Sequence, residues 1–176
     1  MAFLTAAALT SALLLVQSPR ASEYQVKAVF LFNFAQFVDW RSTPAQDPRA
    51  PLIIGILGDD PFGTILDATV RGEHLGERPF EIRRLRQMRD IEACNILFIS
   101  RSENERVEQI LAAVQNRPVL TVSDGDDFAE RGGMIQFVND KNRIRLRINL
   151  EAAQAANLAI SSKLLRVAEI VSTPKH

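Results

Sequence analysis

Five polar side chains lie at or just after the ends of three apolar runs, where together they could bind a small ligand. The runs cover residues 52–57, 95–100 and 119–123, and the five side chains are Asp59, Ser100, Arg101, Ser102 and Ser123. If the runs are parallel strands, their carboxyl ends meet at one edge of a sheet, which is where open α/β sheets bind ligands. Arg101 and the backbone N–H groups near Ser102 would suit a small anion. Alternatively, Ser102 only caps the helix that follows, and Arg101 extends into water.

Other kinds of reaction chemistry have little support in the sequence. Its two histidines, His74 and His176, are far apart, and the single cysteine, Cys94, completes no zinc-binding pattern. No G-x-S-x-G elbow, P-loop or G-x-G-x-x-G loop is present. We therefore predict a protein that is not an enzyme, with no catalytic residue, metal or cofactor. A hydrolase that uses Ser100 or Ser123 remains an alternative.

Length and charge favour one globular domain that does not bind nucleic acid. The chain has 176 residues, 47% of them hydrophobic, which suits a single domain without metal or disulfide staples. Its 21 basic and 21 acidic residues cancel, whereas nucleic-acid binders usually carry a clustered basic excess. Cys94 stands at the head of an apolar run and is expected to be a small buried hydrophobe.

The first residues are typical of an export signal. Residues 2–16 form an almost unbroken apolar run, which is too short to span a bilayer but suits the core of a secretory signal. No Lys or Arg precedes this run, which suggests that the true start lies upstream. We predict a signal peptide over residues 1–21, with a truncated start, and a mature domain over residues 22–176.

The apolar runs must be strands if the polar residues at their ends are to meet. Residues 52–57 and 95–100 are apolar almost throughout, which is typical of strands buried on both faces. Predicted helices over residues 61–70 and 103–115 alternate with these strands and with the run at 119–123. Strands that alternate with helices indicate parallel pairing through right-handed crossovers.

The carboxyl-terminal third of the sequence does not continue this alternation of strands and helices. Residues 135–138 and 144–148 flank a polar turn and predict an antiparallel hairpin, while a short helix is expected after Gly125. A final helix is predicted from four positions at helical spacing, with Ser161 or Ser162 as its cap: Ile160, Leu164, Val167 and Val171. The predicted fold class is α/β: a single three-layer domain, with a mixed, mostly parallel sheet flanked by helices and a C-terminal antiparallel hairpin.

Two surfaces could bind a partner protein. A helix is predicted over residues 24–40, with Ser22 as its cap, and four of its positions fall on one line: Val26, Phe30, Asn33 and Phe37. Phe32 lies on the other side, so Phe32 and Leu31 are candidates for an exposed contact surface, with internal packing as the alternative. The second candidate is a row of three arginines in the hairpin, which could contact an acidic partner or protect an edge strand: Arg143, Arg145 and Arg147.

Four blocks of residues, in order, resemble a known family. They are Tyr24-x-Val26-Lys27-Ala28-Val29-Phe30-Leu31-Phe32-Asn33-Phe34-Ala35-x-Phe37-Val38-x-Trp40; Leu97-Phe98-Ile99-Ser100; Val119-Leu120-Thr121-Val122-Ser123-Asp124 with Phe128-Ala129-x-x-Gly132-Gly133-Met134-Ile135; and Ile160-Ser161-Ser162-Lys163-Leu164-Leu165. Together they are similar to the YfiR family of periplasmic proteins, over about residues 22–171.

The resemblance implies a regulator located in the periplasm. Such proteins bind the periplasmic part of an inner-membrane diguanylate cyclase and keep it inactive, which controls cyclic di-GMP and biofilm. An outer-membrane lipoprotein relieves the inhibition, some members form homodimers, and small-ligand binding has been proposed. A small-ligand sensor that acts on a sensor kinase is the alternative. This chain has a single cysteine and so departs from members that contain disulfides.

Overall fold

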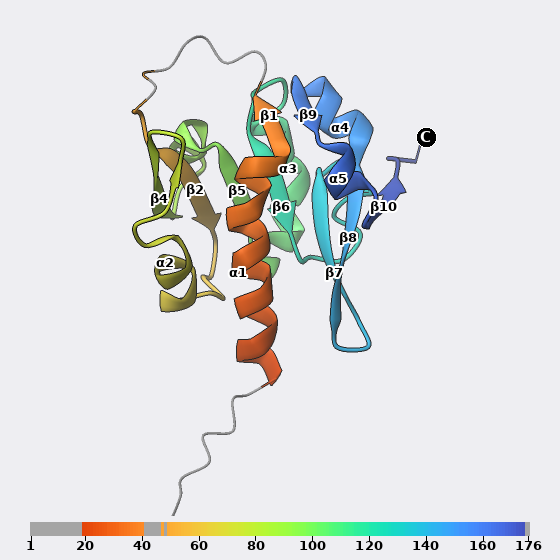
Figure 1. Ribbon diagram of the computed structural model, residues 1–176. Helices are drawn as coiled ribbons and strands as arrows, with labels where there is room; N and C mark the ends of the chain where they lie inside the picture. Colours follow the sequence, from red (N-terminus) through yellow and green to blue (C-terminus); the bar gives the residue numbers. More distant parts are fainter. Residues whose placement is uncertain (1–18, 41–46, 48, 175–176) are drawn as a thin grey trace, which may run out of the picture.

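The computed structural model describes residues 19–40, 47 and 49–174, and its centre is an eight-stranded mixed sheet between two layers of helices (Figure 1). The strand order is β10-β8-β7-β6-β5-β2-β4-β3. This arrangement confirms the predicted fold class. Residues 1–18 of the predicted signal peptide lie outside the described part of the chain.

The three predicted parallel strands are confirmed and lie side by side. They are β2 (Leu52–Leu57), β5 (Ile96–Ile99) and β6 (Leu120–Ser123), and every residue in them is buried. Burial on both faces explains why the sequences of β2 and β5 are continuously apolar. On the far side of β2, the longer β4 (Arg78–Leu85) pairs in parallel with it, and the short β3 (His74–Leu75) closes that edge.

Helices cover both faces of this sheet. On one face, α1 (Pro19–Phe37) and α2 (Thr64–Val70) enclose a core that includes Phe34, Phe62 and Phe98. On the other face, the 3-10 helix η1 (Met88–Ala93) and α3 (Val107–Ala113) cover a second core. The predicted helix 103–115 is shorter than expected, because residues 101–106 form the 3-10 helix η2 (Arg101–Arg106) ahead of α3.

The leading helix differs from the prediction at both ends. It begins at Pro19, so Ser22 lies inside it and does not cap it. It ends at Phe37, and the next three residues form β1 (Val38–Trp40), which pairs with β9 (Leu158–Ile160) in a separate two-stranded sheet. This second sheet fastens the carboxyl end of α1 to the carboxyl-terminal part of the chain.

The predicted hairpin is confirmed as β7 (Ile135–Asp140) and β8 (Arg143–Asn149), joined by Lys141 and Asn142. Both turn residues have positive φ, which is the conformation of a type I′ turn. The next helix, α4 (Leu150–Ala155), begins where the Asn149 side chain accepts a hydrogen bond from the Ala152 N–H at 3.0 Å.

Two predicted helices in the carboxyl-terminal third are wrong. The final helix is replaced by β9, the one-turn α5 (Ser162–Leu165), for which Ser161 is the cap as predicted, and β10 (Ala168–Val171). Because β10 pairs with β8, β8 is not the edge strand that we predicted.

The helix expected after Gly125 is instead a series of turns. In these turns the Gln136 side chain donates to the Gly125 carbonyl at 2.9 Å and accepts from the Ala129 N–H at 3.3 Å. The Arg131 N–H also donates to the Asp127 carbonyl at 2.9 Å, and the segment remains a run of turns.

Cys94 is a buried free thiol, as predicted, and only 4% of it is exposed. Burial raises the pKa of this thiol to about 11. The thiolate is the reactive form, so folding should slow alkylation at pH 8 on the order of 100-fold relative to the unfolded chain. Iodoacetamide labelling, followed by mass spectrometry in buffer and in urea, measures this ratio. Equal rates in the two conditions would show that Cys94 is accessible.

Candidate functional site

The predicted ligand residues do converge at the carboxyl edge of the sheet. The Asp59 N–H donates a hydrogen bond to Ser102 Oγ at 2.9 Å, and the Ser100 N–H donates to the Leu57 carbonyl at 2.9 Å. The Ser123 hydroxyl donates to the Ile99 carbonyl at 2.6 Å. Three loops that are far apart in the sequence are thus joined along one edge.

The serine hydroxyls at this edge are engaged within the chain. Ser100 Oγ accepts a bond from the Ser102 N–H at 3.4 Å, so Ser100 and not Ser102 caps the helical segment that follows. Ser123 Oγ also accepts from the Gly125 N–H at 2.9 Å. Ser100 and Ser123 are buried, whereas Asp59 and Arg101 are exposed. These bonds account for the serines without a ligand, and ligand binding at this edge stays a prediction.

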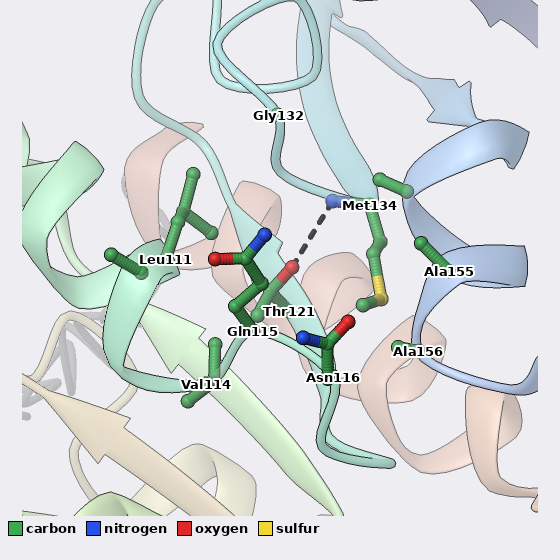
Figure 2. A pocket seen from close by; sticks show the side chains of 11 residues that line it. Leu111, Val114, Gln115, Asn116, Thr121, Gly132, Met134, Ala155 and Ala156 are labelled. Carbon is green, nitrogen blue, oxygen red and sulfur yellow. Dashed lines mark hydrogen bonds between the residues drawn. The ribbon is translucent and has the colours of Figure 1, made fainter.

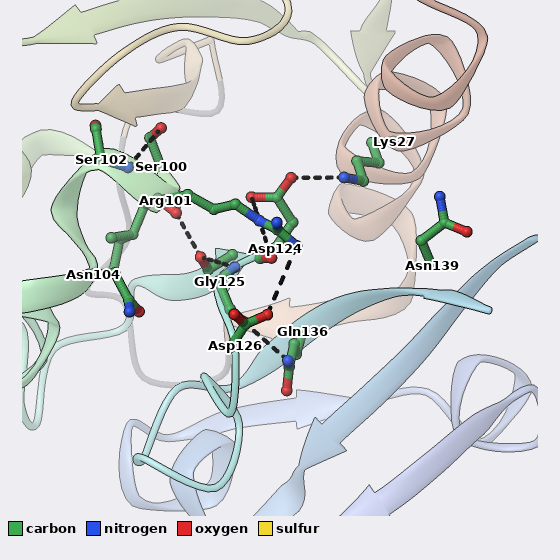
Figure 3. Close-up of polar contacts among 12 residues, drawn as sticks. Lys27, Ser100, Arg101, Ser102, Asn104, Asp124, Gly125, Asp126, Gln136 and Asn139 are labelled. Carbon is green, nitrogen blue, oxygen red and sulfur yellow. Dashed lines mark hydrogen bonds and ion pairs between the residues drawn. The ribbon is translucent and has the colours of Figure 1, made fainter. Parts of the chain in front are cut away.

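The centre of the edge is a buried ion pair that sequence reasoning missed. Asp124 follows β6 and is 2% exposed, and Lys27 of α1 is 1% exposed. The Lys27 Nζ lies 2.6 Å from Asp124 Oδ2 (Figure 3). The Tyr24 hydroxyl donates to the same oxygen at 2.8 Å. Glu23 is a second partner of Lys27 at 2.5 Å. The network therefore ties the start of α1 to the carboxyl end of the central strand.

Arg101 completes the network from the solvent side. Its Nε donates to the Asp124 carbonyl at 2.7 Å and lies 3.6 Å from Asp124 Oδ1 (Figure 3). Burial and the hydrogen bond to Asp124 raise the pKa of Tyr24, so its hydroxyl stays a donor. Burial alone would raise the pKa of Glu23, but the hydrogen bonds from Lys27 and Asn139 hold it below its usual value. Each charged group of the network has a partner within the protein. The network therefore fixes the position of α1 against the sheet.

The exposed face of α1 is not the one that we predicted. Leu31 is fully buried against the sheet, so its exposure as a contact residue is wrong, and Phe32 is half-buried against Phe80 with ring centroids 5.1 Å apart. The exposed apolar residues are instead Val26 and Val29, which are 42% and 49% exposed. With the half-buried Phe30 and with Gln25 and Asn33, they line a shallow hollow of about 360 Å³.

Two of the three predicted arginines have acidic partners within the chain. Arg147 lies 3.0 Å from Glu169 of β10 and 3.2 Å from Glu130, and Arg145 lies 2.8 Å from Asp140. Arg143 is exposed beside the hairpin turn. A contact between these arginines and an acidic partner stays a prediction.

Among the described residues, no group of three His, Cys, Asp or Glu side chains is arranged to hold a metal ion. Within the same residues, no helix has both the length and the apolar character needed to cross a bilayer.

Two solved structures share this fold at low sequence identity. The ABC domain of Streptococcus pneumoniae, solved in complex with L-Trp, has a TM-score of 0.55 and 11% identity, with 84% of this chain and 60% of that chain covered. A conserved domain protein of Vibrio cholerae has a TM-score of 0.57 and 11% identity, with 84% and 59% covered. This chain spans about three fifths of the length of each, and the similarity concerns the fold alone. No curated protein matches the chain.

The chain also matches a sequence family. The match, to the family DUF4154, described as YfiR/HmsC-like, covers residues 24–169, from α1 to β10. It includes both Lys27 and Asp124, which form the ion pair described above. The chain belongs to the YfiR/HmsC-like family.

Proposed function

We propose that this protein is exported to the periplasm, where it binds the periplasmic part of an inner-membrane diguanylate cyclase and keeps that enzyme inactive. Cyclic di-GMP would then be low, and biofilm would be repressed, while the protein is bound. The observation that carries the proposal is the family match over residues 24–169. A sensor kinase is the alternative partner. An outer-membrane lipoprotein that binds this protein would release the cyclase.

We assign the contact to the exposed face of α1, which we define as Gln25, Val26, Val29, Phe30 and Asn33. Exposed apolar side chains that lie together usually mark an interaction surface. None of the five carries a charge, so an apolar partner surface can be buried against them without desolvating an ion.

The side of α1 that faces the sheet is packed in the core. This side holds the buried Lys27, the fully buried Leu31 and Phe34, and the ion pair with Asp124. A helix that is anchored in this way presents its outer face in one orientation, which lowers the entropy lost on binding.

Replacing Val29 with Glu tests both the function and the surface. The charge would have to be desolvated in the complex, so we expect binding to the purified periplasmic domain of the cyclase to weaken at least about tenfold. Cyclic di-GMP should rise to the level of a strain that lacks the protein. Because Val29 is 49% exposed and Glu is a good helix former, the free energy of unfolding should change by less than about 0.5 kcal/mol. Isothermal titration calorimetry, extracted cyclic di-GMP and urea denaturation give the three measurements.

Val167 provides the matched control. It is 69% exposed and lies between α5 and β10, outside the face of α1, so Val167→Glu makes the same chemical change elsewhere. This variant should bind and inhibit normally. If Val167→Glu loses binding and Val29→Glu keeps it, the surface assignment is wrong. If the unmodified protein neither binds a cyclase nor lowers cyclic di-GMP, the function itself is wrong.

A further inference from the structure

Strand β10 (Ala168–Val171) is an open edge of the eight-stranded sheet. It stands first in the strand order, and it pairs only with β8, in parallel (Figure 1). In the described part of the chain no other backbone segment bonds to it, so the N–H and C=O groups that face away from β8 have no backbone partner. The Asn149 side chain donates to Thr173 Oγ1 at 2.9 Å, which holds the residues after β10 toward β8. The outer edge of β10 is therefore available to another strand.

This edge lacks the devices that usually prevent edge strands from pairing with other chains. Proline, lysine and very short length are common among these devices. At the opposite end of the sheet, β3 has only two residues. In contrast, β10 has four residues and contains no proline, lysine or arginine. Its one charged side chain, Glu169, lies 3.0 Å from Arg147 of β8 and is engaged within the chain.

Apolar side chains are exposed along the same edge. The described residues include four exposed large hydrophobic side chains, and two of them are here: Val167 at 69% and Ile170 at 50%. Paired residues share a face of a sheet, and Ile170 is paired with Ile148, which belongs to the core. Ile170 therefore extends the apolar face of the core past β8. An apolar side chain of an added strand would cover it.

The other face of the edge is basic. Glu169 is paired with Arg147, so this face also carries the alternate arginines of β8. A groove of about 600 Å³ lies there, and its lining includes Arg145, Arg147 and Arg166. Arg166 is exposed, and its side chain has no acidic partner among the described residues. Residues 140–171 carry three acidic side chains but six basic ones, although the whole chain is neutral: Lys141, Arg143, Arg145, Arg147, Lys163 and Arg166.

This charge identifies the occupant of the edge as acidic. A second copy of this chain would bring the same basic excess to the edge, and like charges repel. An acidic chain would instead meet complementary charge. The hollow between α3 and α4 differs in this respect, because no charged residue lines it (Figure 2). An acidic segment would thus find counter-charges beside β10 and not in that hollow.

We propose that β10 binds an extended acidic segment of another protein, which pairs with it as an added strand of the sheet. Acidic side chains of the segment lie toward Arg145 and Arg166, and the alternate, apolar side chains lie beside Ile170. Main-chain hydrogen bonds supply the affinity, and the alternation of side chains supplies the specificity. The site is separate from the exposed face of α1 and does not depend on the proposed function.

Three peptides separate the charge from the backbone pairing. The acidic peptide is acetyl-Thr-Val-Glu-Val-Glu-Val-Thr-amide. The basic peptide has Lys in place of both Glu residues, and the third peptide has Pro in place of the central Val, which prevents strand pairing. We expect the acidic peptide to bind the isolated protein with a Kd of about 1 mM or tighter, and the other two at least about tenfold more weakly. Titrations followed by amide NMR shifts give these constants.

Hydrogen exchange shows whether the peptide pairs as a strand. With saturating acidic peptide, the outward-facing N–H groups of Ala168–Val171 should exchange at least about fivefold more slowly, because they become hydrogen-bonded. Binding through charge alone would leave their exchange unchanged and would overturn the proposal.

Arg166→Glu and Arg86→Glu form a matched pair of variants. Both positions are exposed and both substitutions change the net charge equally, but Arg86 follows β4 at the other end of the sheet. Arg166→Glu should weaken the acidic peptide at least about threefold and strengthen the basic one, whereas Arg86→Glu should alter neither. Val29→Glu should bind the acidic peptide as the unmodified protein does, so this test and that of the cyclase contact can fail independently.

Four results would contradict the proposal. The acidic peptide could shift no amide of β10, the proline peptide could bind as well as the acidic one, or the two arginine variants could weaken the acidic peptide equally. The fourth is protection of the β10 amides as the protein alone self-associates, measured by analytical ultracentrifugation and hydrogen exchange at rising concentration. A second copy of this chain would then be the occupant of the edge.

Discussion

Replacing Lys27 with Met should reduce the free energy of unfolding by about 3–5 kcal/mol, the range found when one partner of a buried ion pair is removed. Asp124 is 2% exposed, and without Lys27 its carboxylate would keep only the Tyr24 hydroxyl at 2.8 Å and Arg101 at 3.6 Å. Methionine has a similar length, so the loss would come from the charge and not from a cavity. Urea denaturation at pH 7 measures the change.

Two further variants separate this effect from general damage to α1. Lys27→Met combined with Asp124→Asn leaves no buried carboxylate at position 124, and the amide oxygen of the new side chain would still accept the Tyr24 hydrogen bond. Glu23 loses its bond to Lys27 in both variants, so this loss cancels in the comparison. The double variant should therefore be more stable than Lys27→Met alone. Arg145→Met removes an exposed ion pair with Asp140 and should change stability by less than about 1 kcal/mol. If Lys27→Met has no larger effect than Arg145→Met, the ion pair is not buried in solution.

The central strands could be predicted because their sequences report burial directly. Strands β2 and β5 have no polar side chain, a pattern that is typical of strands covered on both faces, and β6 alternates apolar residues with Thr121 and Ser123. The order of strands and helices then implies parallel pairing, and parallel pairing places Asp59, Ser100 and Ser123 at the same edge. The convergence of these residues was therefore predictable from chain order alone.

The buried side of α1 could not be predicted in this way. Apolar residues surround most of the helix, so the line through Val26 and Phe30 looked as suitable for burial as the line through Leu31 and Phe34. A lysine normally marks the solvent side of a helix. Lys27 is nevertheless buried, because it pairs with Asp124. Asp124 lies 97 positions away, so the sequence around Lys27 does not indicate this contact.

The carboxyl terminus shows tertiary structure overriding a local pattern. Residues 160–171 have helical spacing, yet they contain the last residue of β9, one helical turn and β10. Strand β8 offers an edge, and β10 pairs with it through residues such as Ile170 and Val171, whose branched side chains suit strands.

The second large effect is expected at Gly133, where even one methyl group has no room. A Cβ at this position would lie 2.1–2.4 Å from three ring carbons of Phe128. Phe128 is 1% exposed and packs in the core beneath α3, so its ring has little freedom to move away. Gly133→Ala should therefore reduce the free energy of unfolding by about 3 kcal/mol, at the upper end of the range for overpacked cores. Denaturation in urea gives the value.

A double-variant cycle shows whether the clash with Phe128 is the cause. Phe128→Ala alone should cost about 3–5 kcal/mol through the cavity that it leaves. In that background the added methyl group has space, so Gly133→Ala should cost less than about 1 kcal/mol more, and the two effects should not add. The Gly133 N–H donates to the Phe128 carbonyl at 2.9 Å, which holds the two backbones together and prevents the loop from moving aside. Additive losses would mean that the backbone conformation of Gly133, and not the aromatic ring, excludes a side chain.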